Sequence, residues 1–286
     1  MNLDNTTWFT EICQESGSAF SLKIKRKLHE EQTPFQRIEI YETEQFGNLM
    51  TIDGFVMLTS RDNFIYHEMM SHPALFSHPN PKKALIIGGG DCGTLREVLK
   101  HSTIDHVDQI DIDEQVTRLS ERYFPELCES NHDPRAQLLF IDGIQWVHEQ
   151  ATDSYDVIII DSTDPIGPAE GLFSEAFYRQ CQRLLGDDGI IIAQSESPLL
   201  HMKLLTQIHQ ALQNANFHET RSLFFPQCSY PSGWWTATMA SKNQLLSTFR
   251  EQDARQKTFQ TSYYNAAIHQ AALAAPEFFY QQLQNQ

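Results

Sequence analysis

The sequence predicts an α/β protein in which a small antiparallel β domain precedes a larger, mostly parallel sheet covered by helices. Two patterns carry this prediction. Roughly the first 60 residues contain runs that alternate polar and apolar side chains, as strands with one buried face do. The rest of the chain alternates short apolar runs with helix-like stretches, and a glycine-rich turn follows the first of these runs.

The N-terminal strands are short and separated by turn-forming residues. Residues 21–28 (SLKIKRKL) and 36–41 (QRIEIY) alternate in polarity, and FGNLMTIDGFVMLTS predicts a hairpin that turns at Asp53 and Gly54. The following stretch, FIYHEMMSHPALF, predicts a helix that leads into the second region. We place the boundary near Pro73, which gives an N-terminal β domain with its linker helix (1–73) and a catalytic domain (74–286).

The second region predicts a Rossmann-like domain. Near-continuous apolar strands such as VIII are typical of parallel strands that are buried on both faces. The expected strands are ALIIG, HVDQIDID, AQLLFID, YDVIIID and GIIIAQS, and the helices between them are TLREVLKH, EQVTRLSERYF, GIQWVHEQ and FSEAFYRQCQRLL. The last third adds two strands, FHETRSLFF and WWTATMAS, and a closing helix in YYNAAIHQAALAAPEFF.

Composition excludes several classes of protein. The formal net charge of -16 disfavours a nucleic-acid partner, because phosphates would be repelled. No apolar run is long enough to span a membrane and the first residues lack the order of a signal peptide, so we expect a cytoplasmic protein. The five cysteines contain no C-x-x-C pair, which argues against a disulfide framework and a zinc knuckle.

A glycine-rich loop follows the strand ALIIG. Residues 88–93 (GGGDCG) form a G-x-G-x-x-G pattern with Gly88 and Gly90, which lets backbone approach a nucleotide-like ligand closely. Dinucleotide and adenosylmethionine sites share this pattern, and a turn without a ligand is the structural alternative. Asp91 favours the second ligand, because its carboxylate would repel a pyrophosphate but attract a sulfonium or an ammonium group.

The next two strands also end in carboxylates. Asp111 lies 20 residues beyond Asp91, where it can accept hydrogen bonds from ribose hydroxyls, and Asp113 is a rival for this role. Asp142 and the backbone N–H of Gly143 could meet an adenine ring. Because a strand-end Asp is also a common helix N-cap, a purely structural role for Asp142 stays open.

The fourth strand runs into a loop with two further carboxylates, Asp161 and Asp164. Strand ends in open α/β sheets face one crevice, so these groups and Asp91 should surround a cation. The alternative is that Asp161 caps the next helix and Asp164 lies in solvent. An amine nucleophile needs a base because it is almost fully protonated at neutral pH, and Asp161 could accept that proton. The Pro- and Gly-containing loop suits a gate over bound substrate, or is a plain surface turn.

The segments FGNLMTIDG, FIYHEMMSH, ALIIGGGDCG, VIIIDSTDPIGP, AQSESP, YPSGWW and YYNAAIH together resemble the spermidine synthase family. The resemblance extends from about Phe46 to the tail. It implies a methyltransferase-type Rossmann-like core (class I), a homodimer or homotetramer, and no metal or tightly bound cofactor. The implied reaction moves an aminopropyl group from decarboxylated S-adenosylmethionine to a diamine such as putrescine.

The resemblance also implies residue roles, with Asp161 as the proton acceptor. Donor-binding positions are Gln36, Asp111, Asp142, Gly143 and Pro168. Positions near the diamine and the aminopropyl chain are Tyr66, His67, Asp91, Asp164, Gln194, Tyr230 and Trp234. One of Trp234 and Trp235 should line the crevice because neighbours on a strand point to opposite faces, and the resemblance selects Trp234.

Some residues depart from the family pattern or allow another interpretation. Asp111 stands where the family often has Glu, Cys92 where Gly is usual, and Ser60 and Asn63 where acidic residues are more usual. The HEMMSH run resembles a zinc-binding helix, but His67 and its partner five residues later lie about 140° apart around a helix. We therefore expect no metal site there.

Two other functions remain open on the sequence alone. A methyltransferase that uses intact S-adenosylmethionine would share the glycine loop and Asp111, but Asp91 would repel the donor's carboxylate. A catalytically silent polyamine-binding protein is the second alternative. The acceptor also stays open, because putrescine, cadaverine, agmatine and spermidine differ only in length and one terminal group.

Overall fold

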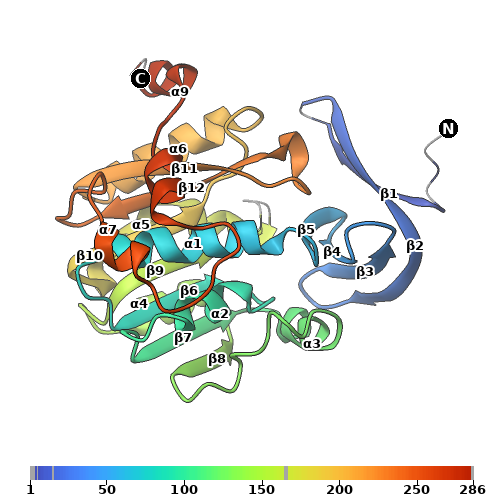
Figure 1. The fold of residues 1–286 in the computed structure, drawn as a ribbon, viewed down its shortest axis with the longest axis horizontal. Helices are drawn as coiled ribbons and strands as arrows, with labels where there is room; N and C mark the ends of the chain where they lie inside the picture. Colours follow the sequence, from blue (N-terminus) through green and yellow to red (C-terminus); the bar gives the residue numbers. More distant parts are fainter. Residues whose placement is uncertain (1–3, 5, 15, 164–166, 285–286) are drawn as a thin grey trace.

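The computed structural model describes residues 4, 6–14, 16–163 and 167–284, and these form two sheets with helices around the larger one (Figure 1). The smaller sheet is made by the N-terminal strands. The larger sheet carries helices on both of its faces. No helix in the described ranges is long and apolar enough to cross a membrane.

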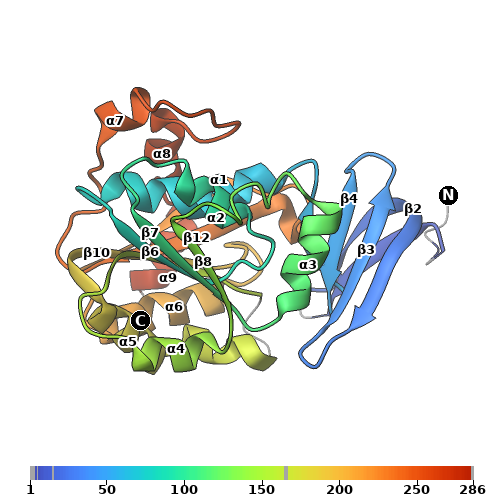
Figure 2. The ribbon, with the colours of Figure 1, turned by 90° about the horizontal axis from the view of Figure 1, so that it is seen from below.

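The N-terminal sheet has five antiparallel strands in chain order: β1 (Trp8–Cys13), β2 (Ser18–Gln32), β3 (Arg37–Thr43), β4 (Asn48–Ile52) and β5 (Phe55–Thr59). The predicted hairpin turn is confirmed, since Asp53 and Gly54 adopt positive φ angles of 52° and 87°. One face of the sheet packs Ile38, Ile40 and Met50 against helix α3 (Glu114–Tyr123), so this sheet rests directly on the larger unit (Figure 2).

The larger sheet has seven strands in the order β11-β12-β10-β9-β6-β7-β8. Five neighbouring strands pair in parallel, and the last strand of the chain pairs antiparallel with the strand on each side of it. Their bounds are β6 (Lys83–Gly88), β7 (His106–Asp111), β8 (Ala136–Phe140), β9 (Tyr155–Asp161), β10 (Leu185–Gln194), β11 (Glu219–Pro226) and β12 (Trp234–Ser241). The chain leaves β6 toward β7 and β8, then returns to β9 on the other side. Ligands bind beyond the carboxyl ends of the strands at such a switch point.

Helices cover the sheet on both faces, which confirms the predicted α/β class. Helix α1 (Asn63–Ser77) packs Met69 and Leu75 onto one face, and Tyr178 of α5 (Glu175–Leu184) packs onto the other. The remaining helices are α2 (Gly93–Leu99), α4 (Gly143–Glu149), α6 (Met202–Asn214), α7 (Glu251–Arg255), α8 (Ala266–Ala272) and α9 (Glu277–Gln284), with short 3-10 turns η1 (Gly167–Phe173) and η2 (Pro231–Gly233).

Two details differ from the sequence-based expectation. Position 73 lies inside α1, because its proline is accommodated within the helix, and the division into domains at this point stays a prediction. The expected closing helix is two helices, α8 and α9, and Pro276 stands between them. Proline cannot donate the backbone hydrogen bond that a continuous helix needs, which explains the break.

Buried neutral histidines predict acid sensitivity. Burial lowers the pKa of His269 from 6.5 to about 3, and its ring stacks on Phe249 with centroids 3.8 Å apart. A depressed folded-state pKa stabilises the protein above pH 6.5, and this contribution is lost as pH falls below that value. We expect His269→Gln to flatten the pH dependence of the unfolding free energy by about 1 kcal/mol per pH unit between pH 6 and 5. Urea titrations of both proteins at pH 7, 6 and 5 measure this, and parallel curves would contradict it.

Candidate active site

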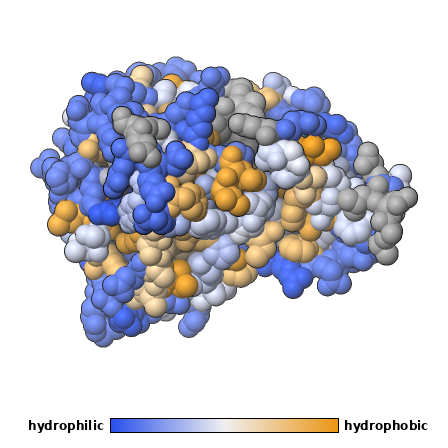
Figure 3. Space-filling view, turned by 90° about the horizontal axis from the view of Figure 1, so that it is seen from above, coloured by the Kyte–Doolittle hydropathy of each residue, from blue (hydrophilic) through white to orange (hydrophobic). Residues whose placement is uncertain are grey.

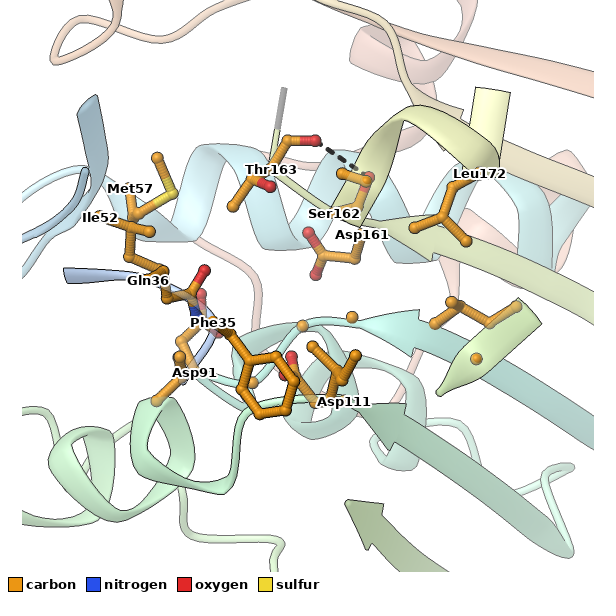
Figure 4. A pocket seen from close by; sticks show the side chains of 18 of the residues that line it. Phe35, Gln36, Ile52, Met57, Asp91, Asp111, Asp161, Ser162, Thr163 and Leu172 are labelled. Atoms are coloured by element: carbon orange, nitrogen blue, oxygen red, sulfur yellow. Dashed lines mark hydrogen bonds between the residues drawn. The ribbon is translucent and has the colours of Figure 1, made fainter. Parts of the chain in front are cut away.

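A cavity of about 340 Å³ lies at the switch point of the large sheet. Its floor is formed by the carboxyl ends of β6, β7 and β9 and by the start of α4. The opposite wall comes from the N-terminal unit through Phe35, Gln36, Ile52 and Met57 (Figure 4). Figure 4 shows the carboxylate of Asp161 directed into the cavity. The site is therefore shared between the two sheets.

The glycine loop brings β6 and β9 into close contact. A Cβ atom on Gly88 would lie 2.1 Å from the carbonyl oxygen of Asp161, and one on Gly90 would lie 2.7 Å from a carboxylate oxygen of Asp111. Gly88 also has a φ of 83°, a conformation that side chains disfavour. Glycine at these two positions therefore allows the backbone of Asp161 and the carboxylate of Asp111 to approach the loop.

Cys92 ends this loop and precedes the first residue of α2. It adopts a φ of 68°, a left-handed conformation in which glycine would be unstrained. Its side chain is fully buried, and its thiol donates to the carbonyl oxygen of Gly90 over 3.6 Å. Space filling beneath the loop is thus its observed role.

Asp161 is buried at the end of β9 between two hydroxyl groups. The Tyr66 hydroxyl donates to Oδ1 at 2.7 Å and the Thr94 hydroxyl donates to Oδ2 at 2.5 Å. Burial, followed by the nearby charge of Asp91, raises the pKa of Asp161. A carboxylate with a raised pKa accepts a proton more readily, so the site contains a base whose orientation is fixed on both oxygens.

Asp91 is paired with His67 from α1. The imidazole Nε2 lies 3.2 Å from the Asp91 carboxylate, which also accepts the backbone N–H of Gly93 at 2.7 Å. Burial opposes ionisation of both side chains, but each stabilises the charge of the other, so the pKa of Asp91 is lowered and that of His67 is raised. His67 does not line the cavity itself; it lies directly behind Asp91.

The zinc interpretation of the HEMMSH run finds no support. His72 points into a separate buried cluster, where its Nε2 lies 3.1 Å from Glu97 and its Nδ1 lies 3.0 Å from His101. Within residues 4–163 and 167–284, apart from the undescribed positions 5 and 15, no group of three or more His, Cys, Asp or Glu side chains could hold a metal ion.

Asp111 and Asp113 were alternatives for the carboxylate that faces the ligand, and the structure gives them different surroundings. Asp111 lines the cavity, and burial raises its pKa to about 6. Asp113 instead caps α3 by accepting the N–H of Gln115, and it accepts the side-chain amide of Gln36 at 3.0 Å. Asp113 thus holds Gln36 at the cavity wall, and Asp111 is the carboxylate that faces the interior.

Asp142 both caps a helix and lines the cavity, which are the two placements that the sequence left open. Its carboxylate caps α4 by accepting the N–H groups of Ile144 at 2.8 Å and Gln145 at 3.3 Å. Asp142 and Gly143 also line the cavity. Because the capping bonds fix the carboxylate at the rim, the structural role does not remove it from the site.

A second cavity of about 80 Å³ adjoins the first, and Met57, Tyr66 and Tyr230 line both. Gln194 from β10 lines it as well. Its walls also include two carboxylates that sequence reasoning missed, Glu11 and Glu196. Glu196 stands in the AQSESP segment, which was a usable signal, whereas Glu11 lies on β1 with no distinguishing pattern.

The tryptophan facing this cavity is Trp235. It lines the second cavity, and its ring meets Tyr230 edge to face with centroids 4.6 Å apart. Trp234 points to the other side of β12, where it packs on Phe224 and Phe278. The geometry therefore does not support the predicted role of Trp234. Side chains alternate along the strand, and the odd-numbered Trp235, not Trp234, is on the side that faces the cavity.

The predicted loop after β9 is only partly described. Asp164 lies outside the described residues. Pro168 falls within η1, and its side chain is outside the described part of the structure.

The fold and the cavity define a class of protein. A methyltransferase-type sheet holds a glycine loop and three carboxylates, Asp91, Asp111 and Asp161, at the ends of neighbouring strands. One of the carboxylates, Asp161, is buried and has a raised pKa. Such a site fits a transferase that binds a cationic, adenosyl-bearing donor beside a second small cation.

Known proteins identify the family. The model of the spermine/spermidine synthase domain matches residues 63–251, and that of the spermidine synthase tetramerisation domain matches residues 7–60. The chain is 66% identical over 284 residues to a polyamine aminopropyltransferase of Thioalkalivibrio sulfidiphilus, covering 99% of each chain. It is 65% identical over 276 residues to one of Methylococcus capsulatus, covering 96% of each. The chain belongs to the spermine/spermidine synthase family.

Solved structures agree with this assignment. A spermidine synthase crystallised with the transition-state analogue AdoDATO superposes with a TM-score of 0.95 at 35% identity, covering 99% of this chain and 97% of that one. Spermidine synthase from Thermotoga maritima gives a TM-score of 0.93 at 35% identity, covering 99% and 96%. The predicted family, fold and enzyme class, a polyamine aminopropyltransferase, are confirmed.

Proposed function

We propose that the protein transfers the aminopropyl group of decarboxylated S-adenosylmethionine to putrescine, yielding spermidine and methylthioadenosine. The observation that carries this proposal is the buried carboxylate of Asp161 in the larger cavity, beside the glycine loop. It accepts a hydrogen bond from Tyr66, which also lines the smaller, carboxylate-lined cavity. The larger cavity has the position of an adenosyl site, and the smaller suits a short cation with charges at both ends.

The donor occupies the larger cavity in this proposal. Gly88 and Gly90 admit it close to the backbone, Asp111 accepts hydrogen bonds from its ribose, and Asp142 with Gly143 meets its adenine. Gln36 and Pro168 complete the donor-binding set carried over from the sequence. Asp91, backed by His67, holds the amino group of the aminopropyl chain. Asp164 is kept from the sequence as a polyamine-binding residue.

The acceptor occupies the smaller cavity. Tyr66, Tyr230 and Trp235 offer aromatic walls for its methylene groups, and Gln194 adds a polar contact. Glu11 and Glu196 hold the far ammonium group, which leaves the near amine beside Asp161. Charge at both ends of an apolar slot favours diamines over monoamines.

Asp161 acts as the proton acceptor in the displacement. The amine nitrogen attacks the carbon attached to the sulfonium, the C–S bond breaks, and its electron pair stays on sulfur as methylthioadenosine. Deprotonating such an amine in water costs about 4 to 5 kcal/mol at neutral pH, which a positioned base offsets. Tyr66 and Thr94 keep the carboxylate oriented, and the loss of sulfonium charge drives the reaction.

Product analysis tests the proposal. Purified protein is incubated with decarboxylated or intact S-adenosylmethionine and a mixture of putrescine, cadaverine, agmatine and spermidine, and products are identified by mass spectrometry. Spermidine as the main product supports the proposal. Methyl transfer from intact donor alone would favour the methyltransferase, and diamine binding without turnover would favour a silent binding protein.

We infer that the protein works as a homodimer or homotetramer in the cytoplasm, without a metal or bound cofactor. The match of the N-terminal sheet to a tetramerisation domain supports an oligomer. Apolar side chains gather toward the middle of one face of the molecule, as surfaces buried by association do (Figure 3). Light scattering after gel filtration measures the oligomer, and activity after exhaustive chelation tests the absence of a metal.

The two tryptophans of β12 provide a matched pair of variants. We expect Trp235→Ala to raise the KM for putrescine by about tenfold or more, because an aromatic wall of the acceptor cavity is lost. Trp234→Ala removes an equal ring on the opposite face and should leave this KM within about twofold. Steady-state kinetics with saturating donor measures both, and an equal effect of the two substitutions would contradict the assignment.

A further inference from the structure

The turn that follows β10 has a strained backbone. Glu196 is a non-glycine residue with a φ of 67°, and it is almost fully buried at the wall of the smaller cavity. Residues rarely hold this conformation unless their surroundings impose it. The position of the Glu196 carboxylate in the cavity therefore depends on what holds this turn, together with the His201 ring, whose Nδ1 lies 2.8 Å from the carboxylate.

Thr236 of the neighbouring strand β12 holds it. Its hydroxyl lies 2.8 Å from the carbonyl oxygen of Glu196 and 3.0 Å from that of Ser195, and its own carbonyl accepts the N–H of Ser195 at 3.0 Å. The Thr236 side chain is completely buried. The side chain of Gln194 in turn accepts the N–H of Glu196 at 3.2 Å, so both cavity residues of the turn depend on these bonds.

A chain of buried hydroxyls supports Thr236 from behind. The Ser195 hydroxyl lies 3.1 Å from that of Thr236 and 2.8 Å from that of Thr238. Thr238 in turn meets Ser222 at 3.0 Å, and Ser222 meets the ring of His209 at 2.8 Å. A hydroxyl group has one proton to donate. When the Ser195 hydroxyl donates to the oxygen of the Thr236 hydroxyl, the Thr236 proton remains available for the backbone carbonyl oxygens of Ser195 and Glu196.

We propose that Thr236 is a positioning residue that sets acceptor affinity by fixing the turn that carries Gln194 and Glu196. This inference rests on the proposed function. Thr236 does not line either cavity, so it acts through the turn and not by contact with substrate.

Valine is the matched substitution, because it keeps the shape of threonine and removes only the hydroxyl. We expect Thr236→Val to raise the KM for putrescine about tenfold, which corresponds to about 1.4 kcal/mol, while kcat and the donor KM stay within about twofold. Thr236→Ser keeps the hydroxyl and should restore the parent KM. Ser222→Ala removes a buried hydroxyl at the other end of this series of hydrogen-bonded hydroxyl groups. It should lower Tm without changing the putrescine KM.

The outcomes separate this inference from the proposed function. An unchanged putrescine KM in Thr236→Val, or an equal rise in Ser222→Ala, would overturn the positioning role. If the parent protein does not turn over decarboxylated donor and putrescine, the proposed function fails. Calorimetric titration of putrescine into the methylthioadenosine-saturated parent and Thr236→Val then tests the inference separately, with weaker binding supporting it and equal or undetectable binding in both refuting it.

Discussion

The Asp161→Asn variant should lose about 10²- to 10⁴-fold in kcat, the usual contribution of a positioned general base. The amide keeps the size of the carboxylate but cannot accept the proton of the attacking amine. Since burial and Asp91 raise the pKa of Asp161, ionising it opposes folding at neutral pH, and the substitution should not lower Tm. Steady-state kinetics with decarboxylated donor and putrescine, together with thermal melts, measures both effects.

Thr94→Val gives the control for orientation. It removes one of the two hydroxyls that donate to Asp161 while the base remains, so we expect a smaller loss of kcat, of about tenfold. A kcat for Asp161→Asn within threefold of the parent, with folded protein, would show that another group accepts the proton.

Asp91→Asn is expected to raise the KM for decarboxylated donor by about 10- to 100-fold and to lower kcat as well. The substitution removes the charge that faces the donor's amine in the proposed function, and it leaves the His67 ring, 3.2 Å away, without its carboxylate partner. Charged hydrogen bonds contribute about 1.5 to 3 kcal/mol, and the loss of alignment adds to this. Donor binding by calorimetry and steady-state kinetics measure the two contributions.

Asp105→Asn is the charge-matched control for this experiment. Asp105 is exposed just before β7, at the end of the sheet opposite the cavity, so its replacement changes net charge equally but removes nothing from the site. Its kinetics should equal those of the parent. Donor KM values for Asp91→Asn and Asp105→Asn that agree within experimental error would remove Asp91 from the donor site.

The arrangement of strands was predictable because each strand carries its own pattern. Apolar runs such as VIII fix buried parallel strands, and the carboxyl ends of such strands must share one edge of the sheet. That rule alone brings Asp91, Asp111 and Asp161 together, as the cavity has them. The hairpin at Asp53 and Gly54 was equally local, since only a few residue types tolerate a positive φ.

Other parts of the site depend on relations between distant segments, which a single sequence does not carry. The phase of β12 decides between Trp234 and Trp235, and it follows from pairing with β10 and β11. Glu11 reaches the smaller cavity only because the two sheets dock, and nothing in its own strand marks it. The separate roles of Asp111 and Asp113 needed the side chain of Gln36 in place.

The docking of the two sheets has a consequence for how substrate preference can change. Gln36 is fixed by Asp113, and the hydroxyl of Tyr230 donates to the backbone of Met57 at 2.6 Å, so each half of the chain orients residues of the other. Without the N-terminal sheet, the larger cavity would lose the wall formed by Phe35 and Gln36, and the smaller cavity would lose Glu11. Diversification toward longer or shorter amines can therefore proceed through the first sixty residues, without touching the groups that perform the chemistry.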